Sequence, residues 1–313
     1  MKVSRIAVHQ KPHLDELFAV WILRNYGEAK FPEISAAKLV VWGEGEATKI
    51  SPEMATMSGT LLVGIGGGVF DEHRQGCEGE CASTLVAKHL GVDKHPLLKR
   101  LLYDVMEADS KADGSLHCLA EEIKNLNRYW VGSLNLEKLY LQFEPHIIAR
   151  VERQKEYSRA KEHFKDCYRN RVGGVAIVAD PDCNPQFQQV ARSRGARVIV
   201  QRNSAGLTQI FGDKGLDMPG LAIRVRKLEI RRSGVRPPRF LNDEELSRVG
   251  TLEGIPQWYL DDNDFLLNGS ESFEDVPPSS IEFKELVYLV EKHLADVARV
   301  SHADKKDEPV MAG

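Results

Sequence analysis

Three side chains of the types that bind metal ions lie within seven residues near the start of the sequence. His9, His13 and Asp15 follow the apolar run 3–8 and precede the segment 16–26, whose apolar residues have helical spacing. Imidazole and carboxylate groups spaced two and four residues apart in a loop can converge on one divalent cation. A polar loop that happens to be rich in histidine is the alternative, and these residues alone favour neither interpretation.

A second group of the same chemical types follows another apolar run. Residues 61–65 lead into the glycines at 66–68 and then into Asp71, Glu72 and His73. Ligands of open α/β sheets gather outside the carboxyl ends of the strands, so two such clusters predict one shared site. A mixture of histidine and carboxylate favours Mn²⁺, with Mg²⁺, Fe²⁺ or Zn²⁺ as alternatives, as one or two ions. A solvated acidic loop with an aspartate that caps the next helix is the other interpretation.

The elements that must position these clusters are those of an α/β protein. The short β-branched runs 39–42 and 61–65 predict buried strands of a mostly parallel sheet, and 80–91 and 95–108 predict helices packed on it. A charged helical pattern at 135–166 predicts a long helix that Pro145 breaks or kinks.

A second α/β unit is predicted beyond that helix. Residues 174–178, 185–193 and 197–200 have the rhythm of strand, helix and strand. A hairpin formed by 258–260 and 265–267 and a final amphipathic helix at about 280–298 complete this unit. The sequence therefore predicts three parts: an α/β domain at 1–134 with helices on both faces of its sheet, a helical connector at 135–170, and a smaller α/β domain at 171–313.

Composition sets limits on location and partners. The 313 residues include 46 acidic and 42 basic side chains, and the net charge of -4 argues against a protein that coats polyanions generally. No apolar run is long enough to predict a membrane span, and the charged N-terminal segment does not resemble a signal peptide. Five sparse cysteines, an odd number, favour reduced thiols and a cytoplasmic location.

The two clusters together resemble those of the DHH phosphoesterase superfamily, and most closely its MYG-like branch. The matching segments are His13-Leu14-Asp15-Glu16, Gly66-Gly67-Gly68-Val69-Phe70-Asp71-Glu72-His73 and Ala82-Ser83-Thr84-Leu85-Val86-Ala87-Lys88-His89-Leu90-Gly91. The resemblance covers about residues 5–115. Two positions depart from the branch: Gly64 stands where it has an aspartate that bridges two metal ions, and Glu72 stands where the first histidine of the DHH motif belongs. One metal ion is therefore the safer expectation.

The resemblance implies attack of a metal-activated water on a phosphoester or phosphoanhydride. It assigns a role to each residue of the two clusters, with Asp109 as the last metal ligand and Asp104 and Asp113 as less favoured choices. Glu72 is implied to be a replacement ligand or a general base, and His73 to contact the substrate phosphate. The implied metal ligands are His9, His13, Asp15, Asp71 and Asp109, of which Asp71 could instead orient the metal site.

Substrate would be held by the second domain, as in DHH enzymes. The basic stretch 224–239, which includes Arg231 and Arg232, could bind phosphate groups, and so could the loop that begins at Arg202 and Asn203. A solvated helix face with internal ion pairs and an ordinary turn are the alternatives.

These observations lead to two hypotheses about function. The first is a metal-dependent hydrolase that acts on a phosphorylated small molecule or a short single-stranded nucleic acid, in the manner of a 3′-to-5′ exonuclease. The second is a degenerate DHH-like protein that binds a nucleotide, RNA or protein partner without full catalysis, which the departures at Gly64 and Glu72 favour. The oligomeric state, including a homodimer, stays open.

Overall fold

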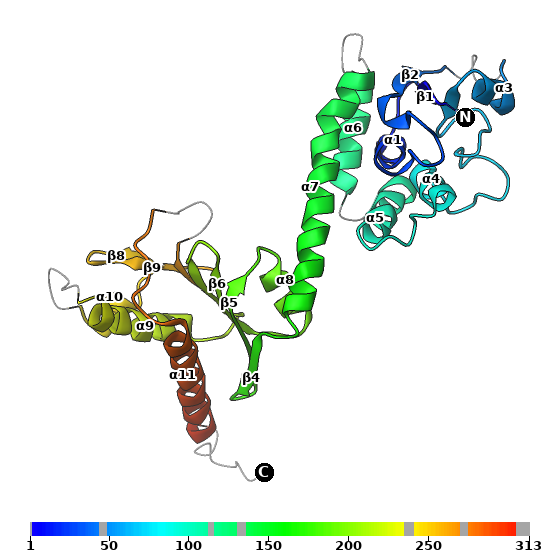
Figure 1. The fold of residues 1–313 in the computed structure, drawn as a ribbon. Coiled ribbons are helices and arrows are strands. Elements are labelled where there is room, and N and C mark those ends of the chain that lie inside the picture. The colour runs from blue at the N-terminus through cyan, green and yellow to red at the C-terminus, as the bar shows by residue number, and fades with distance from the viewer. Residues whose placement is uncertain are drawn as a thin grey trace, which may run out of the picture. The chain divides into compact units, whose positions relative to one another are not determined.

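A computed structural model describes residues 2–43, 49–111, 116–129, 136–234, 241–269 and 275–304, with side chains to 300. The chain divides into two compact units, Met1–Lys155 and Glu156–Gly313. Figure 1 labels their elements, and both units combine helices with a β-sheet. The expected α/β class is confirmed, with a parallel sheet in the first unit and a mixed sheet in the second.

The sheet of the first unit consists, within the described residues, of three parallel strands. These are β1 (Arg5–Val8), β2 (Lys38–Val41) and β3 (Thr60–Leu62), in the order β2-β1-β3. Ile6 of the central strand lies opposite Leu39 and Leu61. The three strands have the positions that the apolar runs predict, because a parallel strand that is covered on both faces must be apolar along its whole length.

Helices pack against both faces of this sheet. Ile6 and Val8 point into a large core, whereas Ala7 points into a smaller one that contains Ala55. Helix α3 supplies Ala55, and the other helices contribute to the large core. The helices are α1 (Leu14–Tyr26), α3 (Pro52–Met57), α4 (Ala82–Leu90), α5 (Lys99–Ser110) and α6 (His117–Tyr129), with a short 3-10 helix η1 (Ile34–Ala36).

Helix α7 (Leu136–His163) is the long helix that the sequence predicts, and it contains the boundary between the units. All of its residues are described, and the helix runs through Pro145 unbroken. Proline removes one backbone hydrogen bond there. Burial of Tyr140, Phe143 and Ile147 on both sides of Pro145 holds the helix against the core and offsets that loss.

The sheet of the second unit has seven strands among the described residues. Strands β5 and β6 are parallel and joined by α8 (Phe187–Ser193), as predicted, and the other neighbours are antiparallel, including the predicted hairpin β9-β10. The sequence analysis did not predict β4, β7 and β8. In sheet order the strands are β4 (Tyr168–Val172), β5 (Val175–Cys183), β6 (Val198–Asn203), β7 (Thr208–Phe211), β10 (Phe265–Asn268), β9 (Ile255–Asp261) and β8 (Gly250–Leu252).

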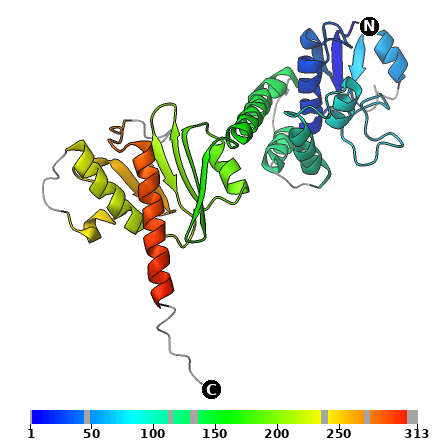
Figure 2. The ribbon, with the colours of Figure 1, turned by 60° about the horizontal axis from the view of Figure 1, so that its bottom comes forward.

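Two cores cover the two faces of this sheet. Helices α9 (Met218–Ser233) and α11 (Phe283–Asp304) pack on one face, and Figure 2 shows α11 lying along it. Helix α8 packs on the other face. A short helix, α10 (Asp243–Leu246), follows α9. Within the described ranges, no helix is both long and apolar enough to cross a membrane.

A buried arginine and a buried glutamate from the basic stretch tie α9 to its surroundings. The guanidinium of Arg226 donates to the carbonyl oxygens of Leu246 and Trp258 at 2.8 and 3.1 Å, and to those of Arg248 and Gly250. Glu229, one turn further along the helix, accepts from Trp258 Nε1 at 2.8 Å. Buried charges are tolerated where hydrogen bonds satisfy them in this way, so this part of the basic stretch is structural.

Candidate metal centre at the strand ends of the first unit

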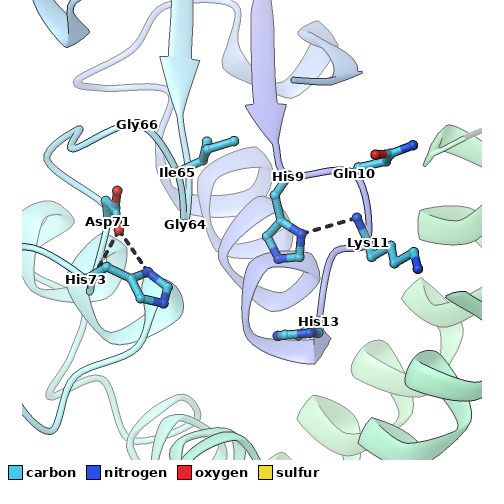
Figure 3. Close-up of a pocket in the computed structure, with 9 residues that line it drawn as sticks. All are labelled: His9, Gln10, Lys11, His13, Gly64, Ile65, Gly66, Asp71 and His73. Carbon is cyan, nitrogen blue, oxygen red and sulfur yellow. Dashed lines mark hydrogen bonds and ion pairs between the residues drawn. The ribbon is translucent and has the colours of Figure 1, made fainter. Parts of the chain in front are cut away.

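The predicted clusters meet at a pocket of about 680 Å³ at the carboxyl ends of β1 and β3. The loop from β1 to α1 forms one wall, and the segment from Gly64 to His73 forms the other. Figure 3 shows the imidazoles of His9 and His13 from the first wall and that of His73 from the second, all directed toward the same space. The site therefore lies where the strand-end argument predicts it.

His9 is held from both sides of its ring. Its Nδ1 accepts from the backbone N–H of Lys11 at 3.2 Å, and its Nε2 lies 2.7 Å from Oε1 of Glu16. The ring meets that of His13 edge to face, with 5.1 Å between centroids.

His13 is suited to be a neutral ligand. The side-chain amide of Asn127 on α6 donates to the carbonyl of Pro12 at 2.7 Å and so fixes the loop just before it. Burial and the nearby His9 ring lower the pKa of His13. A neutral imidazole keeps a lone pair free, which is the form that binds metal ions.

Asp15 and Glu16 form a buried pair of carboxyl groups in the first turn of α1. They are 1% and 2% exposed. Oδ2 of Asp15 accepts from the N–H of Ala82 at 3.2 Å, at the N-terminus of α4, where the helix dipole favours negative charge. Oδ1 of Asp15 is also buried and has no hydrogen-bond partner in the described part of the chain. Burial, followed by the neighbouring carboxyl groups, raises the pKa of Asp15, and burial raises the pKa of Glu16.

Glu16 belongs to a segment that matches the MYG-like branch, but the sequence analysis assigned it no role. Its Oε2 accepts from the backbone N–H of His13 at 2.6 Å while its Oε1 contacts His9. The sequence did contain a signal for it, because a glutamate three residues after the N-cap at His13 is the capping-box spacing.

Gly64 is necessary for Glu16 to lie where it does. Its φ of +65° is in the left-handed region, which side chains other than that of glycine rarely adopt. A Cβ atom built on Gly64 would be only 2.7 Å from both Cγ and Oε1 of Glu16. The space above the end of β3, which a side chain at position 64 would fill, therefore holds the carboxylate of Glu16.

In the second cluster, Asp71 and His73 line the pocket, and Glu72 approaches Asp15 and Glu16. Oδ1 of Asp71 accepts from the backbone N–H of His73 at 3.0 Å, and Oδ2 accepts from that of Gly67 at 2.7 Å. Burial raises the pKa of Glu72, whose buried Oε2 finds no hydrogen-bond partner among the described residues. The side chain of His73 is 78% exposed, with Nδ1 3.1 Å from Oδ1 of Asp71.

The ligand atoms gather in small overlapping groups. Within each group, one ligand atom per residue lies within 4.8 Å of those of the others, and Asp109 of α5 joins through His13 and Asp15. Glu72 links the two walls because it groups with Asp15 and Glu16, whereas Asp71 groups only with its neighbours Glu72 and His73. The groups are His9, His13 and Glu16; His13, Asp15 and Asp109; Asp15, Glu16 and Glu72; and Asp71, Glu72 and His73.

The residues predicted to bind substrate lie in the second unit. Nε of Arg202 donates to Oγ1 of Thr208 at 2.8 Å, and Asn203 lines a separate pocket in that unit. Arg231 is exposed on α9, and Arg232 forms an ion pair with Glu285. Whether these four residues bind a phosphorylated substrate stays a prediction.

Much of the rest of the basic stretch has partners inside the unit. Arg224 lies 2.7 Å from Asp296 of α11, and Lys227 lies 2.5 Å from Asp243 of α10. Arg236 and Arg239, which belong to the same stretch, lie outside the described residues, as does Asp113 in the first unit.

No family model and no curated protein sequence matches this chain. The chemistry of the site must therefore be argued from its own residues.

Replacing Gly64 tests the contact with Glu16. Gly64→Ala should lower the free energy of unfolding by about 1–3 kcal/mol more than Gly67→Ala, as for an overpacked core position. Gly67 is a matched control, because its φ is +68° but nothing lies within 4 Å of the Cβ that it would gain. Equal losses for the two variants in denaturant titrations would contradict the contact.

The buried carboxyl pair predicts how stability depends on pH in the metal-free protein. Asp15 and Glu16 hold their protons more tightly in the folded than in the unfolded chain, because burial raises both pKa values. The stability that this protonation contributes is present at low pH and is lost as the pH rises from about 5 to about 8. In the presence of a chelator, the melting temperature of wild type should therefore fall more over this pH range than that of Glu16→Gln. If the two melting temperatures change with pH in parallel, the buried pair does not have the raised pKa values that we describe.

Proposed function

We propose that the first unit is a metal-dependent phosphoesterase. Its substrate would be a small phosphorylated molecule or a short single-stranded nucleic acid, cleaved in the manner of a 3′-to-5′ exonuclease. The observation that carries the proposal is the pair of buried carboxylate oxygens, Oδ1 of Asp15 and Oε2 of Glu72, to which the described residues offer no hydrogen-bond partner. Buried acceptors without a donor are costly, and a cation between them would remove that cost.

The donor set fits a divalent cation of the first transition series. His13, Asp15 and Asp109 form one ligand group and would hold it. His9 and Glu16 share a group with His13, and Glu72 shares one with Asp15 and Glu16, so these residues would complete the site or hold a second ion. Mixed imidazole and carboxylate donors favour Mn²⁺ over Mg²⁺. When bound, such an ion lowers the pKa of a water molecule toward ~7 and neutralises charge on phosphoryl oxygens.

His73, which lines the pocket, and its neighbour Glu72 have properties that suit phosphoryl chemistry. Partial burial of His73 opposes its protonation, but the hydrogen bond to Asp71 and the charge of Glu72 outweigh it and raise the pKa of His73. A charged, exposed imidazole would bind a substrate phosphate. The raised pKa of Glu72 brings this carboxyl group closer to the range of a general acid or base at neutral pH.

Glu16 accounts for the main departure from the MYG-like pattern. That pattern places an aspartate where this chain has Gly64, and here the carboxylate of Glu16 occupies the space beside Gly64. We infer that Glu16 supplies the carboxylate that position 64 lacks. On this proposal, the departure at Gly64 does not remove a carboxylate from the site.

A degenerate binding protein is the second candidate, and one observation favours it. Both oxygens of Glu16 already have partners, namely the ring of His9 and the backbone N–H of His13. A carboxylate used in this way could stabilise the loop without binding a metal ion. The protein would then hold a nucleotide, RNA or protein partner without turnover.

The thiols are consistent with a reducing, cytoplasmic location. All five cysteines lie within the described residues, and each is a free thiol. Burial raises the pKa of Cys81 and of Cys183 to about 12, so neither is a nucleophile at neutral pH.

Hydrolysis assays decide between the two candidates. Chelator-treated protein should gain activity with Mn²⁺ on at least one of pyrophosphate, dinucleotides, cyclic dinucleotides, short RNA or short DNA. Asp15→Asn and Asp109→Asn should each lower the rate by about a hundredfold or more, because second-shell changes alone cost 10- to 100-fold. Asp104→Asn is the control on the same helix, because Asp104 pairs with Arg100 and belongs to none of the four ligand groups.

Turnover that does not depend on Mn²⁺, or that is unchanged in Asp15→Asn, would contradict the phosphoesterase proposal. Metal binding without turnover on any of these substrates would favour the binding protein.

A further inference from the structure

The second unit contains a pocket that the proposed hydrolysis does not use. It has a volume of about 700 Å³ and lies at the carboxyl ends of the parallel strands β5 and β6, next to α8 (Figure 1). Ligands of α/β units bind at this edge, and the volume is that of a small-molecule site. The walls carry side-chain amides, including those of Gln188, Gln201, Asn203 and Gln209, and the ring of Phe211.

A chain of hydrogen bonds fixes how the amides are oriented. Nε2 of Gln209 donates to the carbonyl of Gly269 at 3.3 Å, so its Oε1 is left as the acceptor. Gln201, directly opposite on β6, donates its Nε2 to that oxygen at 2.9 Å. This hydrogen-bond network assigns the amide orientations, and it directs Oε1 of Gln201 away from Gln209.

This chain of hydrogen bonds ends at an acceptor, Oε1 of Gln201, to which no described residue donates. Gln201 is only 7% exposed, and its Oε1 is buried without a hydrogen-bond partner among the residues that the structure describes. A buried acceptor of this kind costs about 1–3 kcal/mol when nothing donates to it. Gln201 lines the pocket, so the amide that carries this acceptor, together with its second N–H, forms part of the wall.

The described residues of the walls include no positively charged side chain that would attract a phosphate group. Among the described residues that line the pocket, none is lysine or arginine, and the one charged residue is the exposed Asp182. Arg202, predicted to bind phosphate, follows Gln201 on β6 and therefore points to the opposite face of the sheet. There its guanidinium lies 5.5 Å from the centre of the Phe283 ring.

We propose that this pocket binds an adenine-type nucleobase, whose exocyclic amino group donates to Oε1 of Gln201. A glutamine amide offers an acceptor and a donor side by side, which matches the amino group and ring nitrogen of adenine. The ring of Phe211, packed edge to face on Phe265, supplies an aromatic wall for the base. The proposal goes beyond phosphoester hydrolysis and holds whether or not the first unit is an enzyme.

The test compares adenosine with purine riboside, which differ only by the amino group. Both are titrated calorimetrically into the full chain in chelator, so that hydrolysis and metal binding play no part. Adenosine should bind wild type about tenfold more tightly, the value of one hydrogen bond to a buried acceptor. No adenosine binding, or equal binding of the two nucleosides, would overturn the proposal on wild type alone.

Gln201→Leu assigns the preference to this residue. It should make adenosine and purine riboside bind alike, whereas Gln257→Leu should keep the tenfold difference. Gln257 is a matched control because it is also a buried glutamine of this sheet but does not line the pocket. If a folded Gln201→Leu, verified by circular dichroism, keeps the preference, the base lies elsewhere and the proposal fails.

Discussion

The first unit is organised around two adjacent carboxyl groups that are buried in the first turn of α1. Burying Asp15 and Glu16 together is unfavourable unless hydrogen bonds, protons or cations compensate their charge. The surroundings supply such compensation: the N-terminus of α4 faces Asp15, and the ring of His9 and the N–H of His13 face Glu16. Gly64 leaves the room that this arrangement needs. Oδ1 of Asp15 has no hydrogen-bond partner among the described residues, and we propose that a metal ion binds to this oxygen.

In the second unit, several basic side chains are paired with partners inside the fold. Its densest basic stretch is largely used within the fold, because Arg226 is buried among backbone carbonyls and Arg224 and Arg232 pair with acidic residues of α11. The open surface at its strand ends instead carries one charged residue, Asp182, and is rich in amides. Binding there would depend on hydrogen-bond pattern and shape, and would be less sensitive to salt than binding through a basic face.

Local signals in the sequence were sufficient to predict the parallel strands, the βαβ unit and the position of His9 and His13 between β1 and the first helix. That helix begins at Leu14, earlier than predicted, and so includes Asp15. Local signals were not sufficient where the outcome depends on partners far along the chain. The ion pairs of the basic stretch could not be predicted, because Glu285 and Asp296 lie more than fifty residues away. Gln201 and Gln209 could not be paired without β7, a short strand that only its neighbours in the sheet stabilise. No role was assigned to Glu16, because the position of its carboxylate beside Gly64 depends on two elements being placed together.

The most direct test of this account is whether the chain binds Mn²⁺ at the buried carboxyl pair. Electron paramagnetic resonance of free Mn²⁺, titrated with chelator-treated protein, measures the number and affinity of bound ions regardless of any substrate. The account predicts at least one ion per chain in wild type, and affinity about tenfold or more weaker in Asp15→Asn and Glu16→Gln, each folded by circular dichroism. Wild-type protein that binds no Mn²⁺, or variants that bind it as tightly as wild type, would contradict the central claim.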